Sequence, residues 1–149
     1  MNSALHFIDA NVPMYAVGAE HPLKRPCVAI LDAIADGSLV ATTSVEVLQE
    51  ILHRYTALGQ RERAVEIVRL FLEVIPAPLP VTLPDLLLAM DLHLRHPTLQ
   101  ARDVIHLAVM DTHGITRIIT ADQHFDHVPG ITRVDPVDWA ASPPAAQRT

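Results

Sequence analysis

The sequence predicts one α/β domain, a three-layer α/β/α arrangement around a central and mainly parallel sheet. Short apolar or β-branched runs alternate with longer segments of helical periodicity, the order typical of βαβ units. The chain has 149 residues, about one domain, and 50% of them are hydrophobic, which is enough for a substantial core. We find no internal repeat and no interdomain linker. We therefore assign residues 1–138 to one domain and residues 139–149 to a flexible C-terminal tail.

Periodicity and turn residues place the elements along the chain. Strands are expected where apolar and β-branched residues form short runs, at residues 4–8, 39–43, 116–120 and 131–134, with a brief fifth strand around Val81 among prolines. Helices are expected at residues 24–36, 44–58, 60–74, 84–95 and 101–113. Ser44 occupies an N-cap position, and glycines stand just after three of the helices, where glycine is favoured: Gly37, Gly59 and Gly114.

The composition excludes several classes of protein. No apolar run approaches the roughly 20 residues of a membrane span, and no charged leader precedes an apolar stretch. The single cysteine, Cys27, excludes an intrachain disulfide and a cysteine-rich zinc site. The five glycines never form the dinucleotide-binding pattern G-x-G-x-x-G. We therefore expect a cytoplasmic protein that does not span a membrane.

Acidic residues recur at or near the expected ends of strands. Asp9 follows the first strand directly, and Asp122 lies two residues after the strand that ends at Thr120. The helix after the second strand carries Glu50 less than two turns from its start, and Asp103 lies in the first turn of a later helix. Because the ligand crevice of a parallel sheet lies beyond the carboxyl ends of its strands, these four carboxylates can meet there.

Carboxylates held close together repel each other and raise one another's pKa. A hard divalent cation with oxygen ligands removes that conflict, and Mg²⁺ and Mn²⁺ both suit carboxylate and water oxygens. One or two such ions can activate water for in-line attack on a phosphodiester and stabilise the leaving oxygen. The four acids therefore indicate a Mg²⁺ or Mn²⁺ site.

Each acid also has an ordinary structural interpretation. Asp9, followed by Asn11 and Pro13, is equally suited to capping the next helix. Glu50 and Glu46 lie one turn apart on a polar helix face, and helical periodicity does not choose between them. The combination and order of the acids, rather than any single one, favour a site.

Four segments carry these acids: Phe-Ile-Asp-Ala-Asn at residues 7–11, Thr-Ser at 43–44 with Glu50 six residues after the serine, Asp-Val-Ile-His-Leu-Ala at 103–108, and Ile-Ile-Thr-Ala-Asp-Gln-His-Phe-Asp at 118–126. They resemble the PIN-domain nucleases, in particular the VapC-type toxins of bacterial toxin–antitoxin pairs. His-Val-Pro-Gly-Ile at residues 127–131 continues the match, which spans about residues 5–135. Each motif alone is unspecific, but their order and spacing together are fairly specific.

The resemblance implies a role for each matching residue. Its spacing selects Glu50 over Glu46. Four acids would form the metal site: Asp9, Glu50, Asp103 and Asp122. Four residues would support them: Asn11 as an orienting amide, Ser44 and Thr120 as hydroxyl groups, and Asp126 as a further carboxylate or, equally, a surface or helix-cap residue. We interpret His106 as a partly buried structural residue, because water activated by a metal needs no histidine base.

The resemblance also implies an activity and partners. The expected function is that of a metal-dependent endoribonuclease, the toxin of a toxin–antitoxin pair, which hydrolyses RNA to 5′-phosphate and 3′-hydroxyl ends with Mg²⁺ or Mn²⁺ as cofactor. A cognate antitoxin would occupy its groove, and a homodimer would form, with the helical residues 64–72 offering one face. Arginines near the site would hold the RNA backbone, and the candidates are Arg54, Arg102 and Arg117.

The net charge of −6 is unusual for a nucleic-acid enzyme, because phosphate binders usually carry a basic footprint. Ten of the eleven basic residues are arginines, which can hold a phosphate bidentately. Bound metal would also neutralise several carboxylates. The balance still predicts weak nonspecific affinity for RNA.

Two other interpretations compete with this one. A phosphoryl-transfer domain, such as a haloacid-dehalogenase-like phosphatase or a receiver domain, also places an aspartate after its first strand. It needs a lysine near the phosphate, and the only lysine, Lys24, lies early in the chain. A catalytically inactive PIN-like module that binds RNA or protein is the stronger rival, because it predicts the same fold without metal-dependent hydrolysis.

Overall fold

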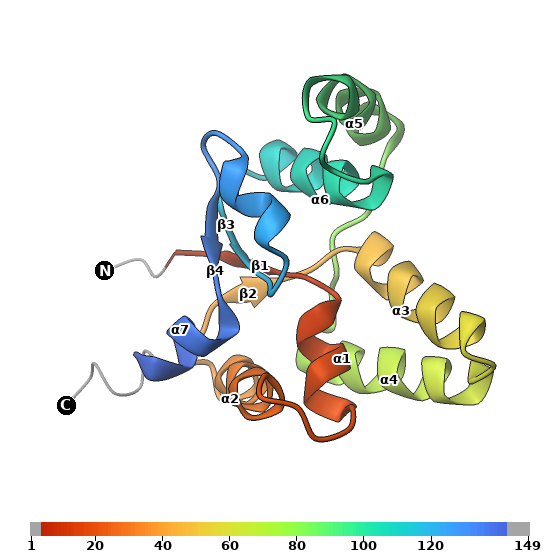
Figure 1. The fold of residues 1–149 in the computed structure, drawn as a ribbon, viewed down its shortest axis with the longest axis vertical. Helices are drawn as coiled ribbons and strands as arrows, with labels where there is room; N and C mark the ends of the chain where they lie inside the picture. The colour runs from red at the N-terminus through yellow and green to blue at the C-terminus, as the bar shows by residue number, and fades with distance from the viewer. Residues whose placement is uncertain (1–3, 143–149) are drawn as a thin grey trace.

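The computed structural model describes residues 4–142 and places a four-stranded sheet at the centre of the molecule (Figure 1). The strands are β1 (His6–Ile8), β2 (Ala41–Thr42), β3 (Arg117–Ile119) and β4 (Thr132–Val134), in the spatial order β2-β1-β3-β4. Phe7 of β1 lies opposite Thr42 on one side and Ile118 on the other. All three strand pairs are parallel, which confirms the predicted sheet.

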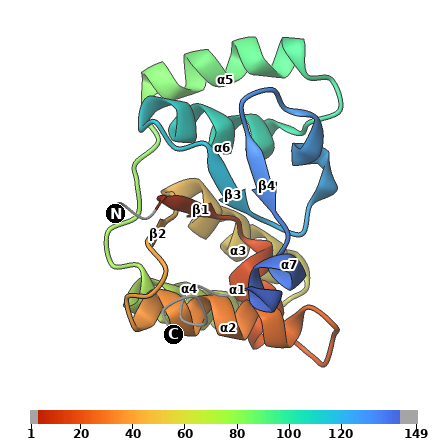
Figure 2. The same cartoon turned by 90° about the vertical axis from the view of Figure 1, so that its left-hand side faces the viewer.

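Helices cover both faces of this sheet (Figure 2). On one face lie α5 (Leu83–Arg95) and α6 (Ala101–Thr112), and on the other lie α1 (Asn11–Val17), α2 (Lys24–Ala35), α4 (Arg61–Val74) and α7 (Pro136–Ala141). The remaining helices are α3 (Val45–Ala57), which packs against α4 and α6, and the short 3₁₀ helix η1 (Gln123–His127) after β3. The predicted three-layer α/β/α architecture is therefore confirmed.

The two central strands are buried on both sides. Phe7 and Ile8 of β1 and Ile118 and Ile119 of β3 are all 0% exposed. Consecutive strand residues point to opposite faces, so burial of both requires a helix layer on each face. Each such side chain contributes roughly 1.5–3 kcal/mol through burial. This packing holds the carboxyl ends of β1 and β3 side by side.

The five predicted helices agree with the structure to within one residue at each end. Ser44 caps α3, its Oγ accepting a hydrogen bond from the Val47 N–H at 3.4 Å. Gly59 and Gly114 follow α3 and α6 with φ of 74° and 67°, in the left-handed region that favours glycine. These caps set the ends of α3, which carries Glu50, and of α6, which carries residues 103–108.

The segment around Val81 is not a strand, contrary to the prediction. Leu79 instead forms a single parallel bridge with Ser44. The Leu79 N–H donates to the Thr43 carbonyl at 2.8 Å, and the Leu79 carbonyl accepts from the Val45 N–H at 2.9 Å. The residues on either side of Leu79 are prolines, which have no N–H to donate, so the pairing cannot extend.

Helical periodicity does not predict α1, η1 or α7, because none of them has more than seven residues.

The predicted boundary between domain and tail, after residue 138, falls inside α7. Trp139 is buried where α7 packs against α2, so the ordered structure continues to the end of that helix. Residues 143–149 of the predicted tail lie outside the described residues. None of the helices in residues 4–142 has the length and apolar character that crossing a bilayer requires.

Candidate metal centre

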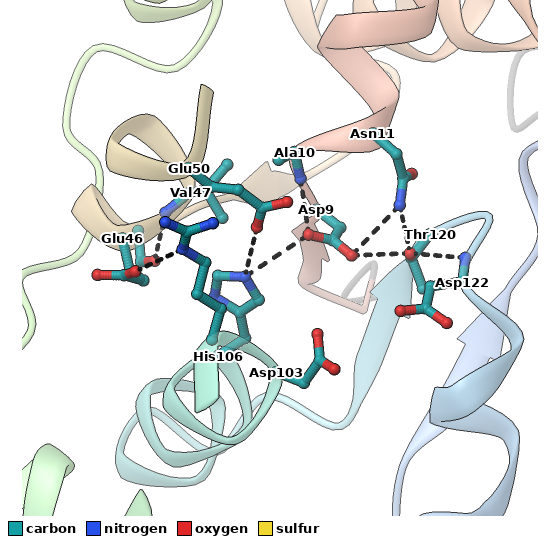
Figure 3. Close-up of polar contacts among 12 residues, drawn as sticks. Asp9, Ala10, Asn11, Glu46, Val47, Glu50, Asp103, His106, Thr120 and Asp122 are labelled. Atoms are coloured by element: carbon teal, nitrogen blue, oxygen red, sulfur yellow. Dashed lines mark hydrogen bonds and ion pairs between the residues drawn. The ribbon is translucent and has the colours of Figure 1, made fainter. Parts of the chain in front are cut away.

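Asp9 stands at the carboxyl end of β1, where three donors hold its carboxylate (Figure 3). The Ala10 N–H donates to Asp9 Oδ1 at 2.7 Å. The Thr120 hydroxyl donates to Asp9 Oδ2 at 2.8 Å, and Asn11 Nδ2 donates to the same oxygen at 3.3 Å. Asp9 is only 5% exposed. A buried carboxylate with donors on both oxygens is fixed in one orientation.

Thr120 joins the ends of β1 and β3. Besides donating to Asp9, its Oγ1 accepts hydrogen bonds from Asn11 Nδ2 at 2.8 Å and from the Asp122 N–H at 3.0 Å. The amide oxygen of Asn11 accepts from the Ala121 N–H at 3.1 Å. The loop after β3 is thereby tied to the start of α1, and Asn11 and Thr120 lie beside Asp9, as predicted.

Glu50 reaches the same place from α3 and is 8% exposed. Its Oε2 lies 3.0 Å from Arg54 Nε, one turn further along the helix. Glu46, one turn earlier, pairs instead with Arg102, whose Nε lies 3.4 Å from Glu46 Oε1. Figure 3 shows the two glutamates diverging, with Glu50 directed toward Asp9. The packing of α3 thus separates two residues that periodicity leaves equivalent.

His106 lies between the carboxylates of Asp9 and Glu50 and is fully buried (Figure 3). Its Nε2 is 3.6 Å from Asp9 Oδ1 and 3.5 Å from Glu50 Oε1, so one donor atom from each residue lies within 4.8 Å of the other two. These separations exceed hydrogen-bond length, and the contacts are electrostatic. His106 was expected to be partly buried, whereas the structure shows it fully buried and facing two acids. Its place one turn after Asp103, on the same helix face, was the available signal.

Asp103 and Asp122 approach from the ends of two other elements. Asp103 Oδ2 accepts a hydrogen bond from the Gln100 N–H at 3.0 Å, within the capping box of α6. Asp122 caps η1, its Oδ1 accepting from the His124 N–H at 2.9 Å, with His124 Nδ1 also 2.9 Å away. Both acids are half-buried. All four predicted acids line one cavity of about 310 Å³, the carboxylate cavity: Asp9, Glu50, Asp103 and Asp122.

The crowding of these groups perturbs their ionisation. Burial raises the pKa of Asp9, and the charge of Glu50 raises it further. Burial likewise raises the pKa of Asp103, and the neighbouring carboxylates add to the effect. Burial acts the same way on Glu50, but His106 and the nearby arginines outweigh it and leave the pKa of Glu50 lowered. Burial lowers the pKa of His106, but the surrounding carboxylates outweigh burial and leave that pKa raised.

Several predicted residues lie outside the carboxylate cavity. The Ser44 hydroxyl is buried at the start of α3, which it caps. Asp126 is exposed and pairs with an arginine of β4 at 2.7 Å. Arg117 begins β3 and therefore lies at the end of the strand away from the cavity, whereas Arg54 and Arg102 line it. Of the candidate arginines, only the last two can reach a ligand there.

The donor set fits a hard divalent cation. Four carboxylates from β1, α3, α6 and the loop after β3 face one cavity, and two of them have raised pKa values because they are buried together. Such a set is unfavourable without a positive counter-charge, and oxygen ligands of this kind are those that Mg²⁺ and Mn²⁺ prefer. Cysteine takes no part, because Cys27 is buried elsewhere, in α2.

Comparison with known proteins agrees with the fold and identifies the family. A model of the PIN domain family matches residues 6–131. The chain therefore belongs to the PIN-domain family. Within that family its relatives include the VapC ribonuclease Mb1869c of Mycobacterium bovis, which is 42% identical over 127 residues, covering 85% of this chain and 97% of the relative. At this identity and coverage the chain belongs with the VapC ribonucleases.

Two solved structures share the architecture. One is VapBC2 from Rickettsia felis bound to a DNA fragment from the promoter, with a TM-score of 0.69 and 12% identity over 88% of this chain and 98% of that one. The other is a toxin–antitoxin complex from Klebsiella pneumoniae, with a TM-score of 0.61 and 20% identity over 90% of this chain and 98% of that one. At these identities the likeness is one of fold.

Proposed function

We propose that this protein is a metal-dependent endoribonuclease, the toxin of a toxin–antitoxin pair, which hydrolyses RNA phosphodiesters at the carboxylate cavity. One observation carries the proposal: four carboxylates from four separate elements line a single cavity. The relatives named as ribonucleases support the class of reaction. We propose the cytoplasm as its compartment, because the RNA that it would cleave lies there.

Mg²⁺ or Mn²⁺ is the cofactor that these residues suit. Asp9, Glu50, Asp103 and Asp122 would hold the ion through carboxylate oxygens, and the ion would relieve the repulsion that raises the pKa of Asp9 and of Asp103. When bound, the ion supplies Lewis-acid stabilisation of phosphoryl oxygens and lowers the pKa of water. The acids are therefore proposed as the metal site and as the catalytic centre.

The chain's own residues orient the acids and the substrate. Hydrogen bonds from Thr120 and Asn11 keep the Asp9 carboxylate in one orientation, so little reorganisation is needed when substrate binds. Arg54 and Arg102 line the cavity with side chains that are 58% and 30% exposed. Their guanidinium groups would hold RNA phosphates, which they can contact bidentately.

The proposal includes two protein partners. A cognate antitoxin would occupy the groove at the carboxylate cavity, where it would block the access of RNA to the four acids. A second copy of the chain would pack on the exposed side of α4, where Val65 and Leu70 are 42% and 43% exposed. Light scattering during size-exclusion chromatography at several concentrations tests the homodimer, and a strict monomer would contradict it.

RNA cleavage by the purified protein tests the proposed activity. We expect cleavage of single-stranded RNA with Mn²⁺ or Mg²⁺, none in excess chelator, and a large loss in both Asp9→Asn and Asp103→Asn. Circular dichroism controls for the fold of the variants. Undiminished cleavage in both variants would contradict the assignment. An intact protein that neither cleaves RNA nor binds Mn²⁺ in calorimetry would instead be an inactive binding module.

A further inference from the structure

A second cavity adjoins the carboxylate cavity. It has a volume of about 240 Å³ and is lined by residues of α1 and α3, namely Asn11, Met14, Tyr15, Arg54 and Tyr55. We call it the tyrosine cavity. Three of these residues, Asn11, Tyr15 and Arg54, also line the carboxylate cavity. The two cavities are therefore direct neighbours, and these three side chains border both.

The tyrosine cavity is lined by the two phenylalanine, tyrosine or tryptophan side chains that are not fully buried, Tyr15 and Tyr55. The chain has three phenylalanines, one tryptophan and two tyrosines. The phenylalanines and the tryptophan are all buried in the core: Phe7, Phe71, Phe125 and Trp139. Tyr15 and Tyr55 are only half-buried, and both line this cavity. Two residues that are 40 positions apart in the chain thus meet beside the four carboxylates.

The polar groups of this cavity remain open to a ligand. Within residues 4–142 neither tyrosine hydroxyl forms a hydrogen bond with another protein group. Neither hydroxyl oxygen is completely buried, so both remain accessible to a ligand. The Tyr15 ring lies 4.6 Å from the ring of His21, which limits its movement. The Arg54 guanidinium is largely exposed although it pairs with Glu50. The wall therefore combines flat aromatic surface, hydroxyl groups and a cation.

We propose that the tyrosine cavity is a subsite for one nucleobase of the RNA, next to the phosphodiester that is cleaved. This inference rests on the proposed ribonuclease function and adds to it the residues that hold a base beside the cleaved bond. Unstacked bases of single-stranded RNA are recognised by stacking on aromatic side chains and on the planar guanidinium of arginine. Arg54 lies between the two cavities, so it can contact the base and its adjoining phosphate together.

The size of the cavity and the net charge of the protein favour a base over other ligands. Its volume of about 240 Å³ is below the roughly 300–1,000 Å³ of pockets that hold drug-sized molecules, and a single base is smaller than those. The protein carries a net charge of −6, so attraction for the RNA backbone is weak overall. Stacking, which does not depend on net charge, supplies affinity where electrostatic attraction is poor.

Fluorescence of 2-aminopurine tests the subsite directly, because stacking on an aromatic ring quenches it. The probe is a single-stranded oligoribonucleotide with one 2-aminopurine moved along successive positions, bound to the uncleaving Asp103→Asn protein. We expect quenching at one position, and loss of that quenching in Tyr15→Leu and Tyr55→Leu, which keep an apolar side chain but remove the ring. RNA affinity should fall by roughly 5- to 150-fold per ring.

Matched variants separate stacking from simple packing. Tyr15→Phe and Tyr55→Phe keep the ring and should quench like the parent protein. Leu94→Ala on α5, where Leu94 is 83% exposed and far along the chain from either cavity, should change nothing. Equal quenching and equal affinity in the Leu and Phe variants would overturn the proposal. So would an absence of quenching at every position of the probe.

Cleavage by the active protein distinguishes this inference from the proposed function. If the protein cleaves RNA, Tyr15→Leu should raise KM more than it lowers kcat, because the lost stacking weakens binding of the substrate. An unchanged KM in Tyr15→Leu would overturn the subsite and leave the ribonuclease function intact. A parent protein that cleaves no RNA with any divalent metal would contradict the function itself.

Discussion

His106 Nε2 lies 3.5 Å from Glu50 Oε1, which joins α6 to α3 through a wholly buried contact. The same nitrogen lies 3.6 Å from Asp9 Oδ1. One imidazole therefore faces two carboxylates that come from different elements. Metal-ligating histidines almost always donate their second ring N–H to a partner, and within residues 4–142 His106 Nδ1 has none. We infer that His106 positions the two carboxylates rather than binding the metal directly.

Replacing His106 should weaken the metal site without removing a ligand. In His106→Leu the two carboxylates lose their shared neighbour, and we expect Mn²⁺ affinity or RNA cleavage to fall by roughly 10- to 100-fold, the usual effect of losing a group that supports metal ligands. His106→Gln, whose amide NH₂ can still donate to a carboxylate, should recover part of the loss. Calorimetry with Mn²⁺ measures this, with His53→Leu on the exposed part of α3 as control. An unchanged affinity in His106→Leu would show that the contact has no positioning role.

Glu50 and Glu46 provide a matched pair on one helix. Glu50→Gln removes a carboxylate that lines the cavity and should abolish most of the cleavage. Glu46→Gln breaks only the partly exposed contact with Arg102, and pairs of that kind contribute about 0–1 kcal/mol. Initial rates with Mn²⁺ and thermal melting compare the two variants. A larger loss of activity in Glu46→Gln than in Glu50→Gln would reverse the assignment.

The ionisation of Asp103 should make the metal-free protein less stable as the pH rises. Burial raises the pKa of Asp103 in the folded state. Its contribution to stability is therefore complete only below its ordinary pKa, about 4, and is lost as the pH rises through the raised value. Asp103→Asn should melt a few degrees higher than the parent protein at pH 7 without metal, since about 1 kcal/mol corresponds to roughly 2–4 °C in proteins of this size.

The same measurement at about pH 3, below the ordinary pKa of an aspartate, and with Mn²⁺ provides the controls. Below pH 4 the Asp103 carboxyl is protonated in both the folded and the unfolded states, so the difference between the two proteins should disappear. Addition of Mn²⁺ at pH 7 should raise the melting temperature of the parent protein more than that of Asp103→Asn. A variant that melts lower than the parent at pH 7 without metal would contradict the prediction.

Arg133 supports the loop that carries Asp122. Its Nε lies 2.7 Å from Asp126, and one terminal nitrogen donates to the Thr120 carbonyl at 3.0 Å and to Asp135 at 3.1 Å. Arg133→Met should destabilise the protein by about 2 kcal/mol or more, because the largely buried Arg133 loses its bonds to the Thr120 carbonyl and Asp135, and such hydrogen bonds to charged groups contribute about 1.5–3 kcal/mol. Denaturant unfolding monitored by circular dichroism measures the loss.

Asp126→Ala separates the two interpretations of Asp126 as a supporting carboxylate and as a surface residue. Its carboxylate pairs with Arg133 and is not among the residues that line the carboxylate cavity. Substitution should therefore leave Mn²⁺ affinity and RNA cleavage within about twofold of the parent protein and change the melting temperature little, because exposed ion pairs contribute little to stability. A tenfold loss of Mn²⁺ affinity would place Asp126 in the metal site after all.

Local chemistry determined the main elements and two of the four acids. Asp9 and Asp122 could be placed at one edge because short apolar runs reveal strands, and parallel strands put their carboxyl ends together. Capping residues such as Ser44 and Gly59 set the helix boundaries for similarly local reasons. The short helices escaped prediction, because one or two turns contain too few apolar positions to establish a period.

Tertiary packing decided what periodicity leaves open. Residues one turn apart lie on the same helix face, so only the rotation of α3 against its neighbours directs Glu50 into the cavity and Glu46 toward Arg102. The burial of His106 between two acids depends on how α6 meets β1 and α3. The tyrosine cavity arises in the same way from α1 and α3. The sequence by itself determined the fold class and the strand-end carboxylates, whereas the groups facing them were decided only when distant segments packed together.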